Sequence, residues 1–209
     1  PNILAISRDI KLIDQKKGYP QNLLGLNQSS FEDLGKKYID ETKWARSSKP
    51  FFIDKMPNNF VHIGLIKLIL PKAKIIDARR NPMDTCFSCF KQYFAKGQHF
   101  TYDLDDIARY YKDYVRLMDY WKKLFPEEIF TINYEQVIDN PNDRIRDLLE
   151  FCNVKFEDSC INFHKSKRPV KTASSEQVRQ PMYKTGLDYW KNYSNYLDTL
   201  LKHFPEYDR

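Results

Sequence analysis

No apolar run in this sequence approaches the roughly 20 residues that a membrane-spanning helix needs, so we expect no membrane span. No signal peptide is visible, and the sequence begins at Pro1 rather than at a methionine. No basic run has the density of a nucleic-acid-binding tail, and no helical pattern carries a stripe of Arg and Lys. We therefore expect no nucleic-acid partner.

Metal and phosphate-loop signatures are also missing. No cluster of Asp, Glu and His has metal-ligand spacing, so we expect no metal cofactor, and no Walker A motif is present. Cys86 and Cys89 form a C-x-x-C pair, which in redox proteins lies at the first turn of a helix, where the thiol pKa is lowered. Here Cys86 follows about a turn later, on a predicted apolar face. We interpret the pair as buried helix residues.

What the sequence does contain is typical of one well-filled globular domain. It has 209 residues, of which 42% are apolar, with 14 Tyr and 14 Phe. We therefore expect a single domain over residues 1–209. The net charge of +6 is compatible with an anionic ligand.

Two short apolar runs predict buried strands, at Pro50–Asp54 and at Lys74–Ala78. Each is followed by a polar segment and then by a helical pattern, which is typical of a parallel sheet covered by helices. Basic residues follow each run: Lys55 follows the first, and Arg79 and Arg80 follow the second. Because ligands of such sheets bind at the carboxyl ends of the strands, these cations mark a candidate anion site.

The helical patterns support that site. The first predicts a helix over Phe60–Leu70, and the second predicts a helix that begins with Asn81 as N-cap and Pro82 at its first position. A helix N-terminus attracts anions, and arginine is a forked phosphate ligand. Ser88 lies on the polar face of the second helix, so it can point towards an anion held by Arg80.

The remaining patterns predict more helices and one more strand. Proline, N-cap residues and the 3.6-residue period predict four helices. They run from Ser29 or Ser30 to Trp44, over Leu104–Leu124 after Thr101 or Asp103 as N-cap, from Asn140-Pro141 to Cys152, and over Gly186–Phe204. An apolar run predicts a strand over Ile129–Tyr134. The segment Lys165–Tyr183 has five Lys or Arg residues and one acid. It is either a solvated loop or a lid over a phosphate site.

Several segments taken together resemble sulfotransferases that use 3′-phosphoadenosine 5′-phosphosulfate (PAPS). They are FIDKMPNNF, RRNPMDTCFSCFKQYF, YDLDDIARYY, NYEQV and TASSEQVRQP. The resemblance is to bacterial sulfotransferase domains often fused to TPR repeats and, more distantly, to tyrosylprotein sulfotransferases. It implies an α/β fold of the P-loop NTPase type, a three-layer sandwich with a parallel sheet flanked by helices. It also implies PAPS as co-substrate, a hydroxyl or amine acceptor, no metal, and a bacterial cytoplasmic location.

The resemblance also implies roles for individual residues. Arg80 and Ser88 match the pair that holds the 3′-phosphate of the nucleotide. Lys55 matches a lysine that stabilises the leaving group, and Tyr134 matches a tyrosine near the nucleotide. Ser174 matches a serine on the cofactor with a candidate catalytic role.

The sequence departs from the family pattern at three places. Gln180 stands where tyrosylprotein sulfotransferases have a lysine, and we expect Arg179 to supply that charge. The 5′-phosphosulfate loop, P-x-S-G-T-T, is absent, so we expect the printed sequence to start inside the domain. The family commonly has a glutamate that acts as base or substrate ligand, and the matching region of this sequence reads AISRD, without a glutamate. Asp9 and His62 are the remaining candidate bases, although a histidine in such a helix is more often structural.

Other functions stay open at this point. A non-catalytic module that binds 3′-phosphoadenosine 5′-phosphate (PAP) would share Arg80 and Ser88 and would explain the missing loop. A relative of P-loop nucleotide kinases would need a Walker A motif. A protein-interaction domain would use its basic loop to bind acidic partners.

Overall fold

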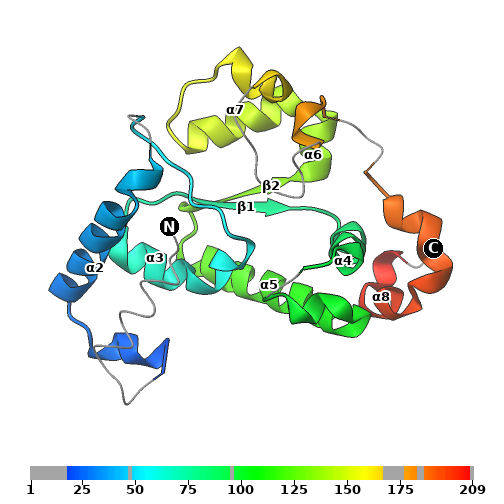
Figure 1. Cartoon of the computed structure of the whole chain (residues 1–209), viewed down its shortest axis with the longest axis horizontal. Coiled ribbons are helices and arrows are strands. Elements are labelled where there is room, and N and C mark those ends of the chain that lie inside the picture. The colour runs from blue at the N-terminus through cyan, green and yellow to red at the C-terminus, as the bar shows by residue number, and fades with distance from the viewer. Residues whose placement is uncertain (1–17, 47–48, 95–96, 167–176, 183–185, 208–209) are drawn as a thin grey trace. The chain divides into compact units, whose positions relative to one another are not determined.

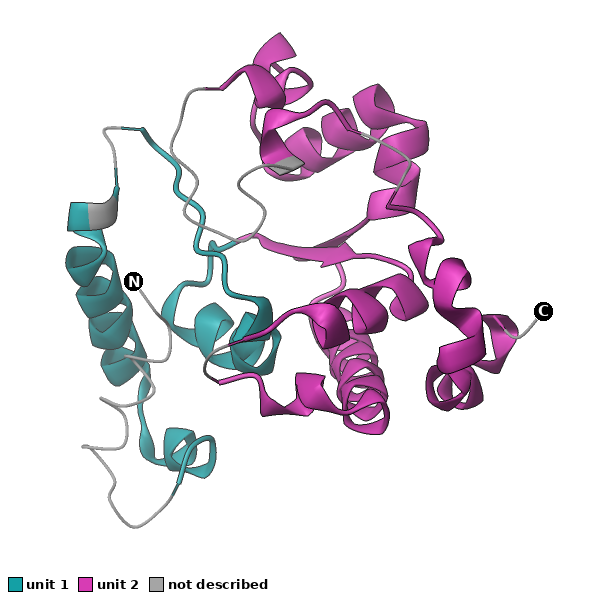
Figure 2. Ribbon diagram, turned by 45° about the vertical axis from the view of Figure 1, so that its right-hand side comes forward, with its two compact units in different colours: residues 1–73 teal, residues 74–209 magenta. Residues whose placement is uncertain are grey.

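The computed structural model describes residues 18–46, 49–94, 97–166, 177–182 and 186–207 (Figure 1). The chain divides into two units, residues 1–73 and residues 74–209, which Figure 2 shows in teal and magenta. The expectation of one domain over the whole sequence stays a prediction.

Unit 1 is built on two helices, α2 (Gln28–Glu41) and α3 (Ile63–Ile69). Asn27, rather than either predicted serine, caps α2: its side-chain oxygen accepts the Ser30 N–H at 2.9 Å. Gly35 allows the two helices to approach closely, because a Cβ there would lie 2.1 Å from the Ile69 carbonyl oxygen. Their facing side chains form a small core of Leu34, Tyr38, Leu65 and Ile69.

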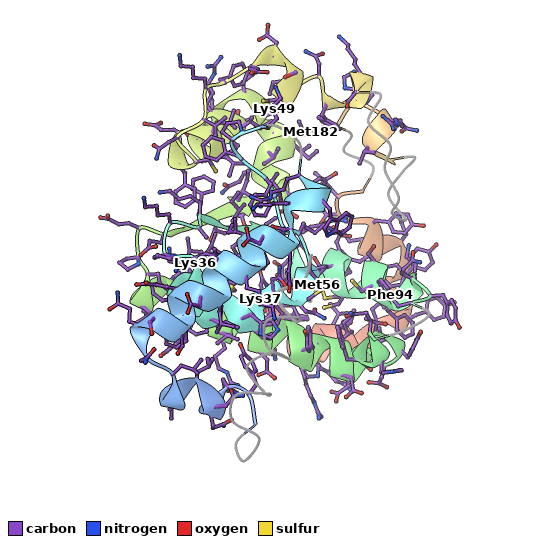
Figure 3. The ribbon with its side chains drawn as sticks, turned by 60° about the vertical axis from the view of Figure 1, so that its left-hand side comes forward. Lys36, Lys37, Lys49, Met56, Phe94 and Met182 are labelled. Atoms are coloured by element: carbon purple, nitrogen blue, oxygen red, sulfur yellow. The ribbon has the colours of Figure 1, made fainter. Side chains whose placement is uncertain are left out.

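The other face of α2 is polar. Figure 3 shows Lys36 and Lys37 on this helix, where their ammonium groups lie 3.1 Å from Asp33 and 3.8 Å from Glu41. All four side chains are largely exposed, so these pairs add little to stability.

The predicted strand Pro50–Asp54 is wrong. Residues 50–54 form no strand. Within the described residues, the sheet consists of two other strands, which pair with each other. Phe51 is 65% exposed and Ile53 is 87% exposed. An apolar run predicts burial, but a strand also requires hydrogen bonds from a neighbouring strand. The following helix, predicted as Phe60–Leu70, begins instead as a 3-10 helix over Pro57–His62 and continues as α3.

The sheet of unit 2 consists of β1 (Ile75–Arg79) and β2 (Ile129–Asn133). The strands are parallel and run in register from Ile75 opposite Ile129 to Arg79 opposite Asn133. Both strands predicted for this unit are therefore confirmed to within one residue at each end. Their carboxyl ends meet at one edge, where the chain continues into Arg80 and Tyr134.

Helices make up most of unit 2. They are α4 (Pro82–Lys91), α5 (Leu104–Leu124), α6 (Tyr134–Asp139), α7 (Pro141–Phe151) and α8 (Asp198–His203). The 3-10 helices are His99–Tyr102, Asp158–Cys160, Phe163–Lys165, Gln177–Arg179, Tyr189–Tyr196 and Pro205–Tyr207. The largest core lies where α4, α5 and α8 meet, and it contains Met83, Cys86, Phe87, Ile107, Ala108, Trp190, Leu197, Leu200 and Phe204.

The helix predicted over Gly186–Phe204 is wrong as one element. It is divided into a 3-10 helix, Tyr189–Tyr196, and α8. The backbone of Asp188 is left-handed, with φ of 56°, which ends any helix begun before it. Helix α6 was not expected, because NYEQV looks like the end of a strand.

The fold is thus mixed α/β, mostly helical, with a small parallel sheet. The three-layer sandwich of the P-loop type stays a prediction. No helix among the described residues is long and apolar enough to cross a membrane.

Candidate functional site

Helix α4 begins directly beyond the carboxyl end of β1, as the sequence predicts. The Asn81 side-chain oxygen accepts the N–H groups of Met83 at 2.9 Å and Asp84 at 3.4 Å, and Pro82 takes the first helical position. The Asn81 N–H in turn donates to Glu135 Oε1 at 2.8 Å. This bond ties the start of α4 to α6, which follows β2, and so fixes the edge where both strands end.

A pocket of about 540 Å³ opens at this edge. Three of the predicted nucleotide-binding residues line it together: Arg80, Ser88 and Tyr134. The full lining is Ala78, Arg79, Arg80, Asp84, Phe87, Ser88, Lys91, Ile132, Tyr134, Val137, Gly186 and Tyr189. The residues come from β1, α4, β2, α6 and the segment before α8.

Arg80 is held from several sides. Its Nη2 donates to the Gly186 carbonyl and lies 3.5 Å from the Asp84 carboxylate. Its guanidinium carbon lies 5.3 Å from the centre of the Tyr134 ring. Its backbone carbonyl accepts the Tyr111 hydroxyl at 3.0 Å. The buried Nε has no partner among the described residues.

Asp84 connects α4 to the segment that precedes α8, a contact that sequence reasoning missed. The residue is only 3% exposed. Its two carboxylate oxygens accept the backbone N–H groups of Asp188 at 2.9 Å and Trp190 at 3.2 Å. The sequence places Asp84 on a polar helix face, but its partners lie more than 100 residues later, so no local pattern identifies them.

Ser88 is exposed on α4, one turn after Asp84, and among the described residues its hydroxyl makes no hydrogen bond. Tyr134 is half-buried at the first position of α6. Both residues line the pocket that Arg80 also lines. The pocket therefore combines an arginine, a serine and a tyrosine beside the first two turns of a ten-residue helix, and these side-chain types are suited to a phosphate group.

Lys91 lines the same pocket, and sequence reasoning missed it too. Its ammonium lies 4.8 Å from the ring centre of Phe87, 4.1 Å from that of Tyr189 and 5.9 Å from that of Tyr193. Lys91 is three residues after Ser88, on the same side of α4. The spacing of three residues from Ser88 in the predicted helix is the sequence signal that could have placed Lys91 near the same site.

Arg79 also borders the pocket, but its charge is used elsewhere. Its Nε donates to the buried Asp77 at 2.7 Å, and Nη2 lies 3.7 Å from Asp119. Asp77 also accepts from the Tyr114 hydroxyl, and burial together with this bond raises the pKa of Tyr114. Arg79 thus fastens β1 to α5.

The other predicted site residues do not line this pocket. Lys55 is an exposed residue of unit 1. Arg179 donates to the Ser166 carbonyl, within the segment predicted as a lid. Ser174 and Asp9 lie outside the described residues, as does most of that segment. The roles predicted for these residues stay predictions.

His62 is buried in unit 1, where its Nδ1 lies 2.8 Å from the Tyr19 hydroxyl. Burial lowers the pKa of His62. A buried, hydrogen-bonded imidazole fits the structural interpretation of this residue better than a role as base.

The C-x-x-C pair is also structural. Cys86 is fully buried, and burial raises the pKa of its thiol to about 12. The pKa of Cys89 is raised for the same reason, and both thiols are free. A redox thiol needs a lowered pKa, so these cysteines pack rather than react.

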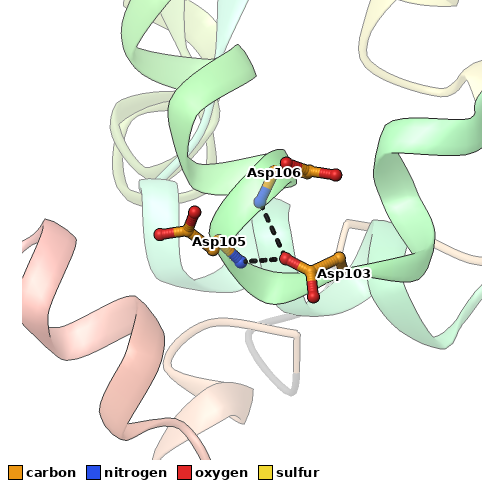
Figure 4. A group of neighbouring side chains, drawn as sticks. All are labelled: Asp103, Asp105 and Asp106. Atoms are coloured by element: carbon orange, nitrogen blue, oxygen red, sulfur yellow. Dashed lines mark hydrogen bonds between the residues drawn. The ribbon is translucent and has the colours of Figure 1, made fainter.

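Three carboxylates gather at the start of α5 (Figure 4). Asp103 caps the helix, since its Oδ1 accepts the N–H groups of Asp105 at 2.8 Å and Asp106 at 3.0 Å. Asp105 lies 2.6 Å from both His203 and Arg109, and the hydrogen bond with His203 is the main cause of its lowered pKa. Capping and ion pairing account for this cluster.

The chain is similar to known proteins over most of its length. A family model described as "Sulfotransferase family" matches residues 13–158. An "Uncharacterized protein" of Aquifex aeolicus (strain VF5) is 35% identical over 196 residues, which are 92% of this chain. This chain spans only 26% of the length of that relative.

Proposed function

Because this chain belongs to the sulfotransferase family, we propose that it moves the sulfuryl group of PAPS to a hydroxyl or amine acceptor. The observation that carries the proposal is the pocket in which Arg80, Ser88 and Tyr134 meet. We assign this pocket to the 3′-phosphate of the nucleotide. The two described strands then belong to the parallel sheet of a P-loop-like sandwich.

The pocket offers the right groups for this phosphate. A guanidinium has five N–H donors; Arg80 uses Nη2 in the contacts described above and its Nε is buried, which leaves the donors of Nη1 for phosphate oxygens. The Ser88 hydroxyl adds a further donor one helical turn from Asp84. The partial positive charge at the start of α4 favours the same anion.

Sulfuryl transfer, like phosphoryl transfer, depends on positioning and on charge neutralisation. The acceptor oxygen or nitrogen attacks sulfur in line, the bond from sulfur to the bridging oxygen breaks, and PAP leaves with the electron pair. Lys55 would neutralise charge on the departing phosphate, and Ser174, Arg179 and Tyr134 would hold the nucleotide. A base then removes the acceptor proton.

A transfer assay tests the reaction. The protein is incubated with sulfur-labelled PAPS and a panel of phenols, alcohols and amines, and labelled product is separated from PAPS. We expect Lys55→Ala to lower kcat by at least about tenfold with little change in nucleotide affinity. Lys72→Ala, an exposed lysine of the same unit, is the matched control. A kcat for Lys55→Ala equal to that of the control would reject the role of Lys55.

The second candidate is a non-catalytic module that binds PAP. Such a module needs only the Arg80 pocket of unit 2 and does not require Lys55 of unit 1. The same assay separates the two candidates when PAP binding is measured alongside. Binding without transfer to any acceptor supports the module, and labelled product supports the enzyme.

A further inference from the structure

The basic residues that line the pocket differ in whether a carboxylate neutralises their charge. Its lining includes the cations Arg79, Arg80 and Lys91 and the acid Asp84. Arg79 is paired with the buried Asp77 at 2.7 Å, and Arg80 lies 3.5 Å from the carboxylate of Asp84. The positive charge of each arginine is therefore offset by a buried carboxylate.

Lys91 differs from both arginines. Within the part of the chain that the structure describes, no carboxylate forms an ion pair with its ammonium. Aromatic rings hold it instead: Tyr189 at 4.1 Å, Phe87 at 4.8 Å and Tyr193 at 5.9 Å. The hydroxyl groups of the two tyrosines lie 3.2 Å apart, which joins their rings into one surface. Such rings attract a cation and restrict its position without cancelling its charge.

We propose that Lys91 is a ligand of the 3′-phosphate and sets the preference of the pocket for a phosphate monoester. The inference rests on the proposed function, because that function places the 3′-phosphate here. A phosphate monoester carries about −1.5 to −2 charges at neutral pH. Arg80 and Asp84 together are close to neutral, so they cannot balance such a dianion. Lys91 supplies the missing charge beside Ser88.

A purely structural role for Lys91 makes a different prediction. In that case the lysine only covers the rings of Phe87 and Tyr189, and its replacement changes stability but not the selectivity for ligands. Methionine has a similar length and no charge, so Lys91→Met keeps most of the packing and removes the cation. Lys91→Arg keeps the cation.

The test is a calorimetric titration of the wild type and its variants with PAP and with 5′-AMP, which lacks the 3′-phosphate. We expect Lys91→Met to weaken PAP binding by about tenfold or more, while 5′-AMP binding stays within about twofold. Lys91→Arg should recover most of the affinity for PAP. Lys112→Met is the matched control, since Lys112 also lies over a ring, that of Phe204 at 5.6 Å, but lines a different pocket.

The outcomes distinguish a failure of the proposed function from a failure of the role proposed for Lys91. A wild type that does not distinguish PAP from 5′-AMP overturns the proposed function itself. A selective wild type with an equally selective Lys91→Met overturns only the role of Lys91. Equal losses for PAP and 5′-AMP in Lys91→Met also overturn it, because the lysine would then act on another part of the nucleotide or on the fold.

Discussion

Removal of the Asp84 carboxylate should strongly destabilise unit 2. This group is only 3% exposed, accepts two backbone N–H groups and lies 3.5 Å from Arg80. A hydrogen bond to a charged group is worth about 1.5–3 kcal/mol, and breaking a buried ion pair costs about 3–5 kcal/mol. Arg80 is 30% exposed, so water can solvate part of its freed charge. We therefore expect Asp84→Ala to lower the free energy of unfolding by about 3 kcal/mol.

Urea unfolding monitored by circular dichroism measures this loss. The slope with urea should stay constant while the midpoint falls, and the melting temperature should drop by about 6–12 °C. Asp84→Asn retains one acceptor oxygen and should lose about half as much free energy.

Asp113→Ala is the control for the loss of a carboxylate. Asp113 lies 3.0 Å from Arg116, but both side chains are well exposed, so its removal should cost less than about 1 kcal/mol. Equal free energies of unfolding for Asp84→Ala and Asp113→Ala would refute the claim that Asp84 fastens the segment before α8 to α4.

Three further predictions concern residues away from the pocket. Burial lowers the pKa of His62 below its ordinary 6.5, so the unfolded chain binds the proton first. The free energy of unfolding should therefore fall as pH drops below 6.5 towards the folded-state pKa of His62. When the urea midpoint is measured as a function of pH, this fall should be absent in His62→Gln. Gly35→Ala should destabilise by about 1–3 kcal/mol in urea because its Cβ would meet the Ile69 carbonyl, whereas Gly25→Ala, with open space around it, should not. Burial raises the pKa of the Cys86 thiol to about 12, so Cys86 should react with a thiol reagent only after urea unfolds the chain; label found on Cys86 by peptide mass spectrometry of the native protein would contradict its burial.

Local sequence signals predicted the elements that local chemistry determines. The bounds of α5, Leu104–Leu124, agree with the prediction because a sustained 3.6-residue period begins after a capping aspartate. The start of α4 was equally clear, since Asn81 and Pro82 are strong signals for the first turn. With β1 before it, this turn was enough to bring Arg80 and Ser88 to one pocket.

Long-range contacts were outside the reach of those signals. Asp84 and Lys91 depend on partners near Trp190, about 100 residues later, and helix periodicity does not show which distant backbone or ring covers a polar face. The error at Pro50–Asp54 has a related cause, because strand formation depends on a neighbouring strand as much as on apolar side chains. Helix α6 was missed because a short helix of six residues has too few turns to show a period.

The central claim is that the Arg80 pocket binds a 3′-phosphate, and the ratio of two dissociation constants tests it most directly. Both PAP and 5′-AMP are titrated into the same wild-type protein, with Arg80→Ala measured in parallel. We predict that PAP binds at least about tenfold more tightly than 5′-AMP, and that Arg80→Ala reduces this ratio towards one. Equal dissociation constants in the wild type, or a ratio unchanged in Arg80→Ala, would contradict the assignment of this pocket.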